Sequence, residues 1–387
     1  MAFYHRLSFA FSGFLQALKR PRRLRKLRAF IHNEQALIKT GVWTEKRTSG
    51  SQGTLVIKCD DIGDFLVWQQ VIPHIVRHAA KPICFVGNKV NKDLVTTYFD
   101  FADAYVWIDK SRWDDADYRL EQYKKVYEFN ATTAFTSLFT RNPKMDDMLL
   151  MASGAENRLA WDMSHHAYFP ELGPDLAGVT TQTITGKRSS TLEYFRNIEF
   201  VNQIYALSVP LQFRPLFPHF GKQNRLVVVP VASSPSKCWK PAFYSEVINS
   251  VISRFDSVIL LGGKDSIEAS RQITASCRNE KLMNFCGETS LNELIPFIGE
   301  SRLLLCPDTF ALHLGVLTAT NTILLTNGTN WQRFSDYGPY ISSRLEVIYP
   351  PEFKPVPNRV KLVYSRSEIN EIRPATVIDA INRMLNP

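Results

Sequence analysis

From residue 54 onward, short apolar runs rich in β-branched residues alternate with segments of helical spacing, and this alternation limits the folds open to the chain. Strands that alternate with helices predict parallel sheets covered by helices on both faces. A length of 387 residues, at roughly 100–200 residues per domain, allows two such α/β domains. The pattern restarts at residue 225 after a turn-rich stretch, which marks the expected boundary between them.

The spacing of apolar residues defines the expected elements. In the first half we expect a less regular, mostly helical stretch over 132–222, a helix at 65–78, and strands at 55–59, 82–86, 104–108 and 125–129. In the second half we expect strands at 225–231, 257–261, 282–285, 303–306 and 322–325, with helices at 241–254, 265–278, 290–299, 311–317 and 367–384. The predicted organisation is an arm with a linker, two Rossmann-like domains and a C-terminal segment, over 1–53, 54–222, 223–345 and 346–387.

Basic charge is concentrated in the N-terminal arm. Residues 1–48 hold 11 Lys and Arg against 2 Asp and Glu, which accounts for the whole net charge of +9 and leaves the rest of the chain neutral. Apolar residues at helical spacing precede the basic cluster at 19–28: Phe3, Leu7, Phe11, Phe14, Leu15 and Leu18. This pattern favours a helix on an anionic membrane surface, with a helix packed on the domain body as the alternative. Nucleic acid is disfavoured, because its footprint would spread over the folded body.

The remaining composition bears on compartment and metal content. None of the 6 cysteines forms a C-x-x-C pair, so we expect buried free thiols in a reducing compartment and no metal site. No apolar stretch reaches the roughly 18 residues of a membrane span. The N-terminus also lacks the order of a signal peptide, since its basic cluster follows the apolar part. We therefore expect a cytoplasmic protein, peripheral at the inner face of the cytoplasmic membrane.

The loop after the first expected strand carries the candidate catalytic residue. Gly63 permits a tight turn, and Asp64 follows it at the start of the next helix. An isolated aspartate here most often caps the helix N-terminus. It can also act as a general base beyond the strand end, where open α/β sheets bind their ligands.

A second candidate loop lies between the strand and the helix that open the second domain. Ser233, Ser234 and Lys237 supply hydroxyl groups and one ammonium, which suit a phosphate or diphosphate. The loop is neither a Walker loop nor a dinucleotide fingerprint, because G-x-x-x-x-G-K-[ST] and G-x-G-x-x-G are both absent.

Two further loops end at the same edge of the expected sheet. The first loop holds Gly262, Gly263, Asp265 and Glu268. The glycines permit close approach of a ligand, and an acidic residue nearby could bind ribose hydroxyls. A tight turn followed by a helix cap explains these residues equally well. The second loop places Asp308, Thr309 and His313 at the start of a helix. Helix capping would explain Asp308 and Thr309 without a function in ligand binding, and a structural role would explain His313.

Five motifs in a fixed order resemble glycosyltransferase family 9, the bacterial ADP-heptose:lipopolysaccharide heptosyltransferase family. The resemblance covers about residues 54–340 and rests on D-I-G-D at 61–64, S-K-C-W at 236–239, L-G-G at 261–263, C-G-E-T-S-L-N-E-L at 286–294 and D-T-F-A-L-H at 308–313. The fourth motif contains Thr289. The last two motifs are the most specific part of the resemblance.

The resemblance implies a GT-B fold, with two Rossmann-like domains facing each other across a cleft. The N-terminal domain would bind mainly the acceptor, a lipopolysaccharide or other lipid-linked surface glycan, and the C-terminal domain would bind the nucleotide-sugar. It also implies an inverting, metal-independent transfer with an ADP-sugar as the favoured co-substrate and no cofactor.

The resemblance also assigns roles to individual residues. Asp64 would be the general base, and Lys237 would hold the donor diphosphate together with the amides around Thr309. Asp308 and His313 would contact the sugar. The rest of the implied donor site comprises Ser233, Ser234, Gly262, Gly263, Asp265, Glu268 and Thr289. A lysine and a helix N-terminus can stabilise the departing diphosphate without a metal.

Three departures from the family pattern bear on the identity of the donor rather than on the fold. Ala232-Ser233 and Phe310 stand where the family usually has glycine, and residues 327–334 replace a G-P-T-like turn. Within that last stretch, Arg333 is predicted to add a contact to phosphate or sugar.

Two alternatives to a transferase remain. A catalytically inactive GT-B protein would only bind a nucleotide-sugar or glycan, and the presence of Asp64 and Lys237 argues against it. A Rossmann oxidoreductase is disfavoured because the glycine fingerprint is absent.

Overall fold

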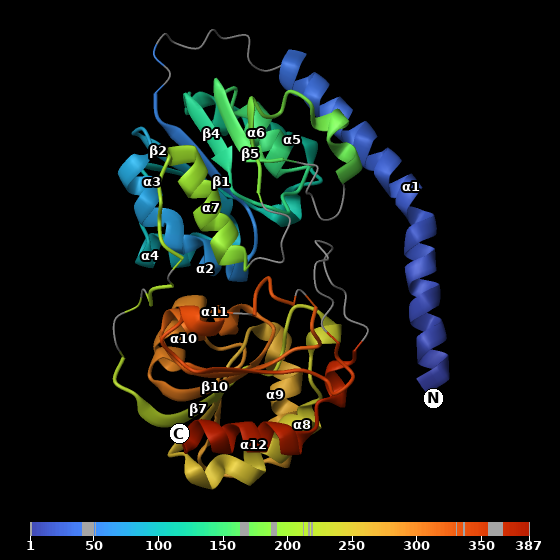
Figure 1. The fold of residues 1–387 in the computed structure, drawn as a ribbon, viewed down its shortest axis with the longest axis vertical. Helices are drawn as coiled ribbons and strands as arrows, with labels where there is room; N and C mark the ends of the chain where they lie inside the picture. The colour runs from blue at the N-terminus through green and yellow to red at the C-terminus, as the bar shows by residue number, and fades with distance from the viewer. Residues whose placement is uncertain are drawn as a thin grey trace. The chain divides into compact units, whose positions relative to one another are not determined.

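The computed structural model describes residues 2–40, 50, 52–162, 170–186, 192–211, 213–215, 217, 220–329, 331–335, 337–354 and 367–386, with side chains from residue 20 onward. The chain forms two compact units. Unit 1 comprises Met1–Cys59, Val76–Lys89 and Ala102–Lys187, and unit 2 comprises Asp60–Ile75, Val90–Phe101 and Arg188–Pro387. Figure 1 shows the elements of each unit coloured along the chain.

Unit 1 is built on a parallel sheet of six strands in the order β3-β2-β1-β4-β5-β6. The strands are β1 (Thr54–Lys58), β2 (Ile83–Asn88), β3 (Ala104–Ile108), β4 (Thr133–Thr136), β5 (Asn157–Trp161) and β6 (Gln182–Ile184). The helices of this unit are α1 (Ala2–Thr40), α5 (Ala116–Glu128) and α6 (Asp146–Ala152), and α3 (Ile72–His78) passes from one unit to the other. All five residues of β1 are buried, as expected for a central strand.

Unit 2 contains a second parallel sheet of six strands, in the order β12-β11-β10-β7-β8-β9. The strands are β7 (Gln223–Val228), β8 (Ser257–Leu260), β9 (Leu282–Asn284), β10 (Ser301–Pro307), β11 (Asn321–Leu325) and β12 (Leu345–Ile348). The helices are α2 (Ile62–Trp68), α4 (Lys92–Tyr98), α7 (Glu193–Tyr205), α8 (Pro241–Val251), α9 (Ile267–Ser276), α10 (Leu291–Gly299), α11 (Phe310–Leu317) and α12 (Pro374–Leu385).

The two sheets share one strand order. In each, the first strand of the unit lies between the second and the fourth, so that β1 pairs with β2 and β4, and β7 pairs with β8 and β10. The strand order reverses between the first and fourth strands. Doubly wound sheets bind ligands beyond the carboxyl ends of the strands at this switch point. The topology therefore directs attention to the loops that follow β1, β4, β7 and β10.

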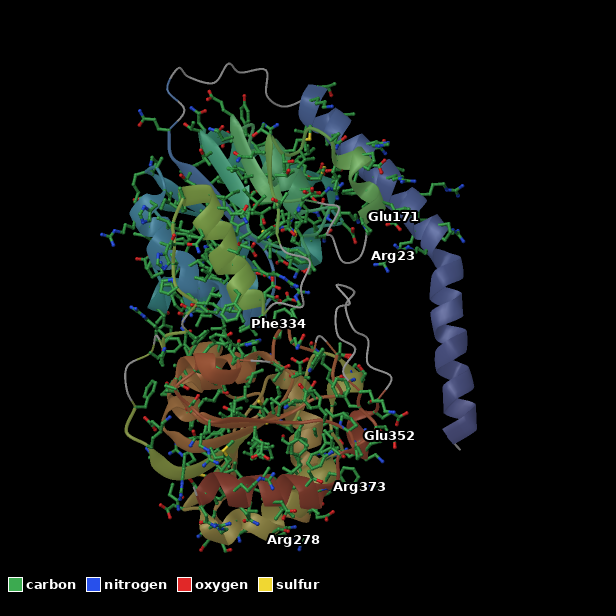
Figure 2. All side chains as sticks on the ribbon, viewed as in Figure 1. Arg23, Glu171, Arg278, Phe334, Glu352 and Arg373 are labelled. Atoms are coloured by element: carbon green, nitrogen blue, oxygen red, sulfur yellow. The ribbon has the colours of Figure 1, made fainter. Side chains whose placement is uncertain are left out.

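The second half of α1 is part of the core of unit 1. Ile31 and Ile38 are buried in the same apolar cluster as β1 and α6. The carboxylate of Glu34 is also buried, and it accepts hydrogen bonds from the Arg119 guanidinium at 2.9 Å and the Tyr123 hydroxyl at 2.8 Å. Arg20 Nη2 lies 2.6 Å from a carboxylate oxygen of Glu171, a residue that Figure 2 labels beside α1. This half of the arm therefore packs on the domain body, whereas the side chains of residues 3–18 lie outside the described part of the structure.

The two-domain α/β fold predicted from the alternation is confirmed, but three local predictions are wrong. Residues 125–129 do not form a strand, because all but the last belong to α5, whose buried residues recur at helical spacing. The stretch 132–222 is not mostly helical, since it supplies β4, β5 and β6. The closing helix begins only at Pro374, after a 3₁₀ turn at Ile369–Glu371, rather than at residue 367. The sequence analysis also missed β12.

Candidate active site

The loops after β7 and β10 meet at the switch point of the second sheet. Lys237 Nζ lies 2.6 Å from Asp308 Oδ2, and the two side chains are 16% and 9% exposed. The two residues are far apart in sequence, so the pairing depends on the adjacency of β7 and β10. The structure thus brings together the cation and one of the carboxylates predicted for the donor site.

The Lys237 loop is fixed by contacts on both sides. The Cys238 thiol lies 3.3 Å from the carbonyl oxygen of Ala232, and Asn327 Nδ2 donates to the carbonyl oxygen of Ser236 at 3.1 Å. Trp239 is buried, and its Nε1–H donates to the carbonyl oxygen of Ile372. The loop is therefore held while its serines remain accessible: Ser233 is exposed and Ser234 is half-buried.

The N-terminus of α11 opens next to this pair. Thr309 is the N-cap residue, but its side chain makes no capping hydrogen bond. The first amides of a helix have no partner within the helix and carry a partial positive charge, which suits an anion. Asp308, which precedes the cap, is engaged by Lys237 rather than by the helix.

Asp64 lies in the first turn of α2. The N-cap of this helix is Asp61, so the capping role considered for Asp64 does not apply. Gly63 packs against α11: a Cβ at this position would stand 3.2 Å from His313 Cδ2 and 3.6 Å from Phe310 Cα. The starts of α2 and α11 therefore approach each other closely at Gly63, and the half-buried Asp64 is the next residue of α2.

His313 is a buried neutral histidine. Its Nδ1 lies 2.6 Å from the hydroxyl oxygen of Tyr337. Burial, helped by the charge of Lys237, lowers the pKa of His313 to about 3. The pKa of Tyr337 is raised, first by its burial and then by the carboxylates of Asp308 and Asp64. Both carboxylates therefore oppose ionisation of the Tyr337 hydroxyl.

The glycine loop after β8 lies against the loop after β9. The amide of Gly287 donates to the carbonyl oxygen of Gly262 at 2.8 Å. A side chain at Gly262 would collide with Ser266, so a tight turn already requires glycine there. Gly263 and Asp265 are exposed. Their assignment to ribose binding stays a prediction.

Glu268 and Thr289, which were also predicted to bind the donor, lie in two different environments. Glu268 is exposed on α9 and accepts hydrogen bonds from Arg271 and Gln272. The Thr289 hydroxyl is buried and has no hydrogen-bond partner among the described residues. Both assignments to donor binding also stay predictions.

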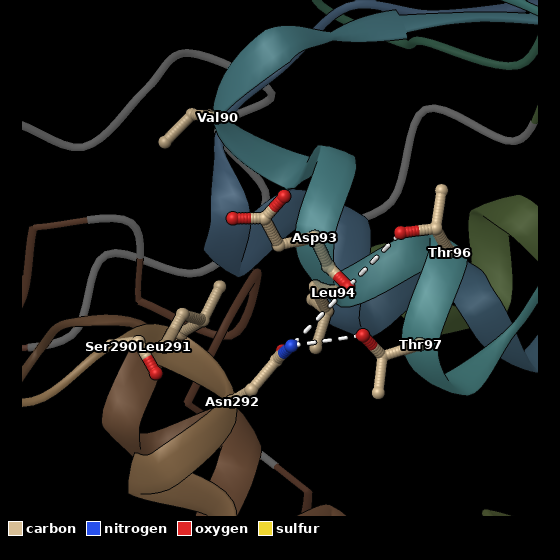
Figure 3. A pocket seen from close by; sticks show the side chains of 8 residues that line it. All are labelled: Val90, Asp93, Leu94, Thr96, Thr97, Ser290, Leu291 and Asn292. Atoms are coloured by element: carbon tan, nitrogen blue, oxygen red, sulfur yellow. Dashed lines mark hydrogen bonds between the residues drawn. The ribbon is translucent and has the colours of Figure 1, made fainter.

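Ser290 and Glu293, next to Thr289, form a capping box at the start of α10. The S-x-x-E spacing that predicts this structure is present in the sequence, and it gives part of the fourth motif a structural role. Asn292 extends from the same turn and donates to Thr97 Oγ1 and to the carbonyl oxygen of Asp93 (Figure 3). A cavity of about 280 Å³ lies between α4 and α10 at this point.

Arg333 is held by an acidic residue of α7. Its Nε lies 2.7 Å from Glu193 Oε2, and its guanidinium stands 4.6 Å from the centroid of the Phe334 ring, which is labelled in Figure 2. Phe334 in turn contacts the His313 ring edge-on, with the two ring centroids 6.0 Å apart. Any contact of Arg333 with a donor would be in addition to the Glu193 pair, and it stays a prediction.

Tyr337 and Glu193 are the site residues that sequence reasoning missed. Neither belongs to a recognisable motif, because each reaches the site through tertiary packing. The only signal was the departure from the family pattern at 327–334, just before Tyr337.

The first sheet has a buried polar cluster at its own switch point. Arg141, in the loop after β4, pairs with Asp147 at 2.6 Å, and both side chains are buried. Asp146 is also buried; its Oδ2 accepts the amide of Asn142 at 2.6 Å, whereas its Oδ1 has no hydrogen-bond partner among the described residues. Burial raises the pKa of Asp146 to about 6.

We expect Asp146→Asn to stabilise the protein above pH 6. The folded pKa lies above the ordinary value of 3.8, so the folded state binds more protons between these values and wild-type stability falls as pH rises. The gain should approach about 3 kcal/mol near pH 7.5 and vanish about one pH unit below the ordinary pKa of 3.8. Urea unfolding of both proteins across this range measures it. Asp147→Asn, which breaks a buried ion pair, should destabilise instead, and a pH-independent difference for Asp146→Asn would contradict the prediction.

Within the described part of the chain, no three or more His, Cys, Asp or Glu side chains converge as metal ligands would. None of its helices combines the length and the apolar character needed to cross a membrane.

Comparison with known proteins identifies the family that this chain resembles. Residues 202–360 match the model of glycosyltransferase family 9 (heptosyltransferase). A lipopolysaccharide heptosyltransferase 3 of Escherichia coli is 24% identical over 168 residues, which cover 42% of this chain and 47% of the relative. The chain thus spans about half the length of the curated relatives it matches.

Solved structures support the same fold. E. coli ADP-heptose lps heptosyltransferase II is 17% identical, with a TM-score of 0.64 over 86% of this chain and 98% of that chain. A glycosyl transferase family 9 protein from Veillonella parvula is 15% identical, with a TM-score of 0.68 over 86% of this chain and 97% of that chain. The resemblance predicted from the five motifs is confirmed.

Proposed function

We propose that this protein, which is heptosyltransferase-like in its motifs and fold, transfers a sugar from a nucleoside-diphosphate sugar to a lipopolysaccharide or other surface glycan. The observation that carries the proposal is the Lys237–Asp308 pair at the switch point of the second sheet, beside the uncapped N-terminus of α11. An ammonium and a helix N-terminus together suit a diphosphate. ADP-heptose is the first donor to test, because the similar E. coli protein is described as an ADP-heptose heptosyltransferase.

The proposed reaction is a single displacement that inverts the anomeric carbon. Asp64 takes the proton of the acceptor hydroxyl as its oxygen forms a bond to the anomeric carbon. The bond from that carbon to the diphosphate oxygen breaks, and its electron pair leaves with the nucleoside diphosphate. Lys237 and the amides of α11 stabilise this developing charge, so the step needs no metal ion.

A nucleotide panel tests the donor site. Ligands that bind only the folded state raise its melting temperature, so wild-type protein is heated with ADP, UDP, GDP, CDP or NAD. We expect ADP to give the largest shift. A larger shift with another nucleoside diphosphate would keep the transferase and replace the donor, whereas no shift with any of the five would contradict the proposal. Binding without transfer to any glycan acceptor would leave the inactive nucleotide-sugar-binding protein.

We also propose that the arm attaches the protein to the inner face of the cytoplasmic membrane. Arg22, Arg25 and Lys26 are exposed on the part of α1 that packs on unit 1. A basic side chain near an anionic bilayer contributes about 1 kcal/mol each. An enzyme that modifies a lipid-linked glycan benefits from this attachment, because its acceptor lies in the same surface.

Replacing Arg22, Arg25 and Lys26 together by Ala should lower binding to anionic vesicles by about two orders of magnitude, given ~1 kcal/mol per side chain. Vesicle sedimentation measures the effect, with neutral vesicles for comparison. Lys124 and Lys125 are exposed basic residues of α5 in the same unit, so their double Ala variant is the matched control. Equal loss per removed charge in both variants would show that only net charge matters, and no loss in either would contradict membrane attachment through α1.

A further inference from the structure

The contact between His313 and Tyr337 defines which nitrogen of the imidazole carries a proton. Tyr337 is fully buried, and its hydroxyl has one hydrogen-bond partner among the described residues, His313 Nδ1. A buried hydroxyl that fails to donate costs free energy, so the O–H must point to Nδ1. A neutral imidazole that accepts at Nδ1 carries its proton on Nε2.

The burial of both rings keeps this arrangement in its uncharged form. The pKa of His313 is lowered to about 3, first by burial and then by Lys237. The pKa of Tyr337 is raised by its burial, so the hydroxyl keeps its proton. Neither ring therefore changes its charge near neutral pH, and the direction of the hydrogen bond is stable.

The opposite edge of the imidazole faces the start of α2. A Cβ placed on Gly63 would stand 3.2 Å from His313 Cδ2 and 3.6 Å from Nε2. Nε2 makes no hydrogen bond to any of the described residues, so its donor remains available beside the residue that precedes Asp64. The absence of a side chain at Gly63 lets the backbone at the start of α2 approach this edge of the ring closely.

We propose that Tyr337 is a positioning residue for the transfer: its O–H donates to His313 Nδ1 and so holds the tautomer whose Nε2–H donates to a hydroxyl of the donor sugar. This inference rests on the proposed function for the identity of the ligand, but the tautomer itself is a property of the protein alone. Tyr337 does not touch the substrate and acts through His313.

The packing around Tyr337 supports a positioning role. Its ring lies edge-on to Phe213, with centroids 5.6 Å apart. The segment that carries it is tied to α7, because the amide of Glu193 donates to the carbonyl oxygen of Arg333 at 2.8 Å in addition to the ion pair between their side chains. Phe334 also contacts the His313 ring, with the ring centroids 6.0 Å apart. Neighbouring aromatic rings therefore pack against both members of the hydrogen-bonded pair.

The test compares Tyr337→Phe with Tyr340→Phe. Tyr340 lies on the same segment but is 37% exposed, so it controls for loss of a tyrosine hydroxyl nearby. The first readout is the ¹⁵N NMR spectrum of the imidazoles, in which a protonated ring nitrogen differs from a bare one, with His313→Gln used to assign the signals. The second readout is kcat and KM with an ADP-sugar, together with the Kd for ADP.

In wild type we expect the His313 proton on Nε2, and in Tyr337→Phe a mixture of both tautomers. We also expect kcat to fall about tenfold in Tyr337→Phe, as for loss of one oriented hydrogen bond, with little change in the Kd for ADP. A proton on Nδ1 in wild type would overturn the inference, and this result requires no variant to fold. Equal kcat in Tyr337→Phe and Tyr340→Phe would also overturn it. The nucleotide panel fails or succeeds independently, so a failed function and a failed tautomer assignment are distinguishable.

Discussion

Replacing Asp64 by Asn is expected to reduce the rate of sugar transfer by about 10²–10⁴-fold, the usual contribution of a general base. The variant keeps the shape of the side chain but cannot take the proton of the acceptor hydroxyl. Because Asp64 lies in the first turn of α2 and is not its N-cap, the change should leave the helix intact. Transfer is measured as ADP release in the presence of acceptor, at saturating donor.

The matched control for this variant is Asp61→Asn. Asp61 is the exposed N-cap of the same helix, and its side chain makes no capping hydrogen bond. We expect nearly full activity in Asp61→Asn and an unchanged Kd for ADP in both variants. If Asp64→Asn transferred sugar at the wild-type rate, another residue would have to be the base.

The sequence predicted those parts of the site whose residues lie in loops that follow strands. Lys237 and Asp308 each lie in a loop that follows a strand of the second parallel sheet, and such loops share one edge. Strand order alone therefore placed these two residues at one edge, whereas Asp64 follows a strand of the first sheet. The contact between Lys237 and Asp308 was not predicted, since it depends on β7 and β10 being neighbours although β8 and β9 lie between them in the chain.

Side-chain packing between segments that are distant in the chain could not be predicted from the sequence. Tyr337 stands in a polar, irregular stretch with no periodicity, and only the folded chain brings its hydroxyl to His313. The predicted strand at 125–129 failed for a related reason. Residues 125–129 contain several residues common in strands, but Tyr123 and Val126 lie three apart on the buried face of α5, so the longer helical pattern determines the structure. The capping box of Ser290 and Glu293 was readable but was taken only as part of a family motif.

Replacing Lys237 by Ala is expected to weaken ADP binding by more than tenfold and to lower kcat by about 10²–10³-fold, as for loss of a group that stabilises a developing oxyanion. The single variant has a second effect, because it leaves the carboxylate of Asp308, which is 9% exposed, without its cation. Removing one partner of a buried ion pair typically costs 3–5 kcal/mol of stability. Weak binding by Lys237→Ala alone could therefore come from damage to the fold.

The double variant Lys237→Ala with Asp308→Asn separates these two effects. It removes both charges together, so the free energy of unfolding should recover most of the loss, whereas no cation would be restored for the diphosphate. ADP affinity from calorimetry and stability from urea unfolding are measured on all variants. Lys240→Ala is the control, because Lys240 is exposed three residues further along and precedes α8. If the stable double variant bound ADP as tightly as wild type, Lys237 would be a structural partner of Asp308 and the diphosphate would have to bind elsewhere.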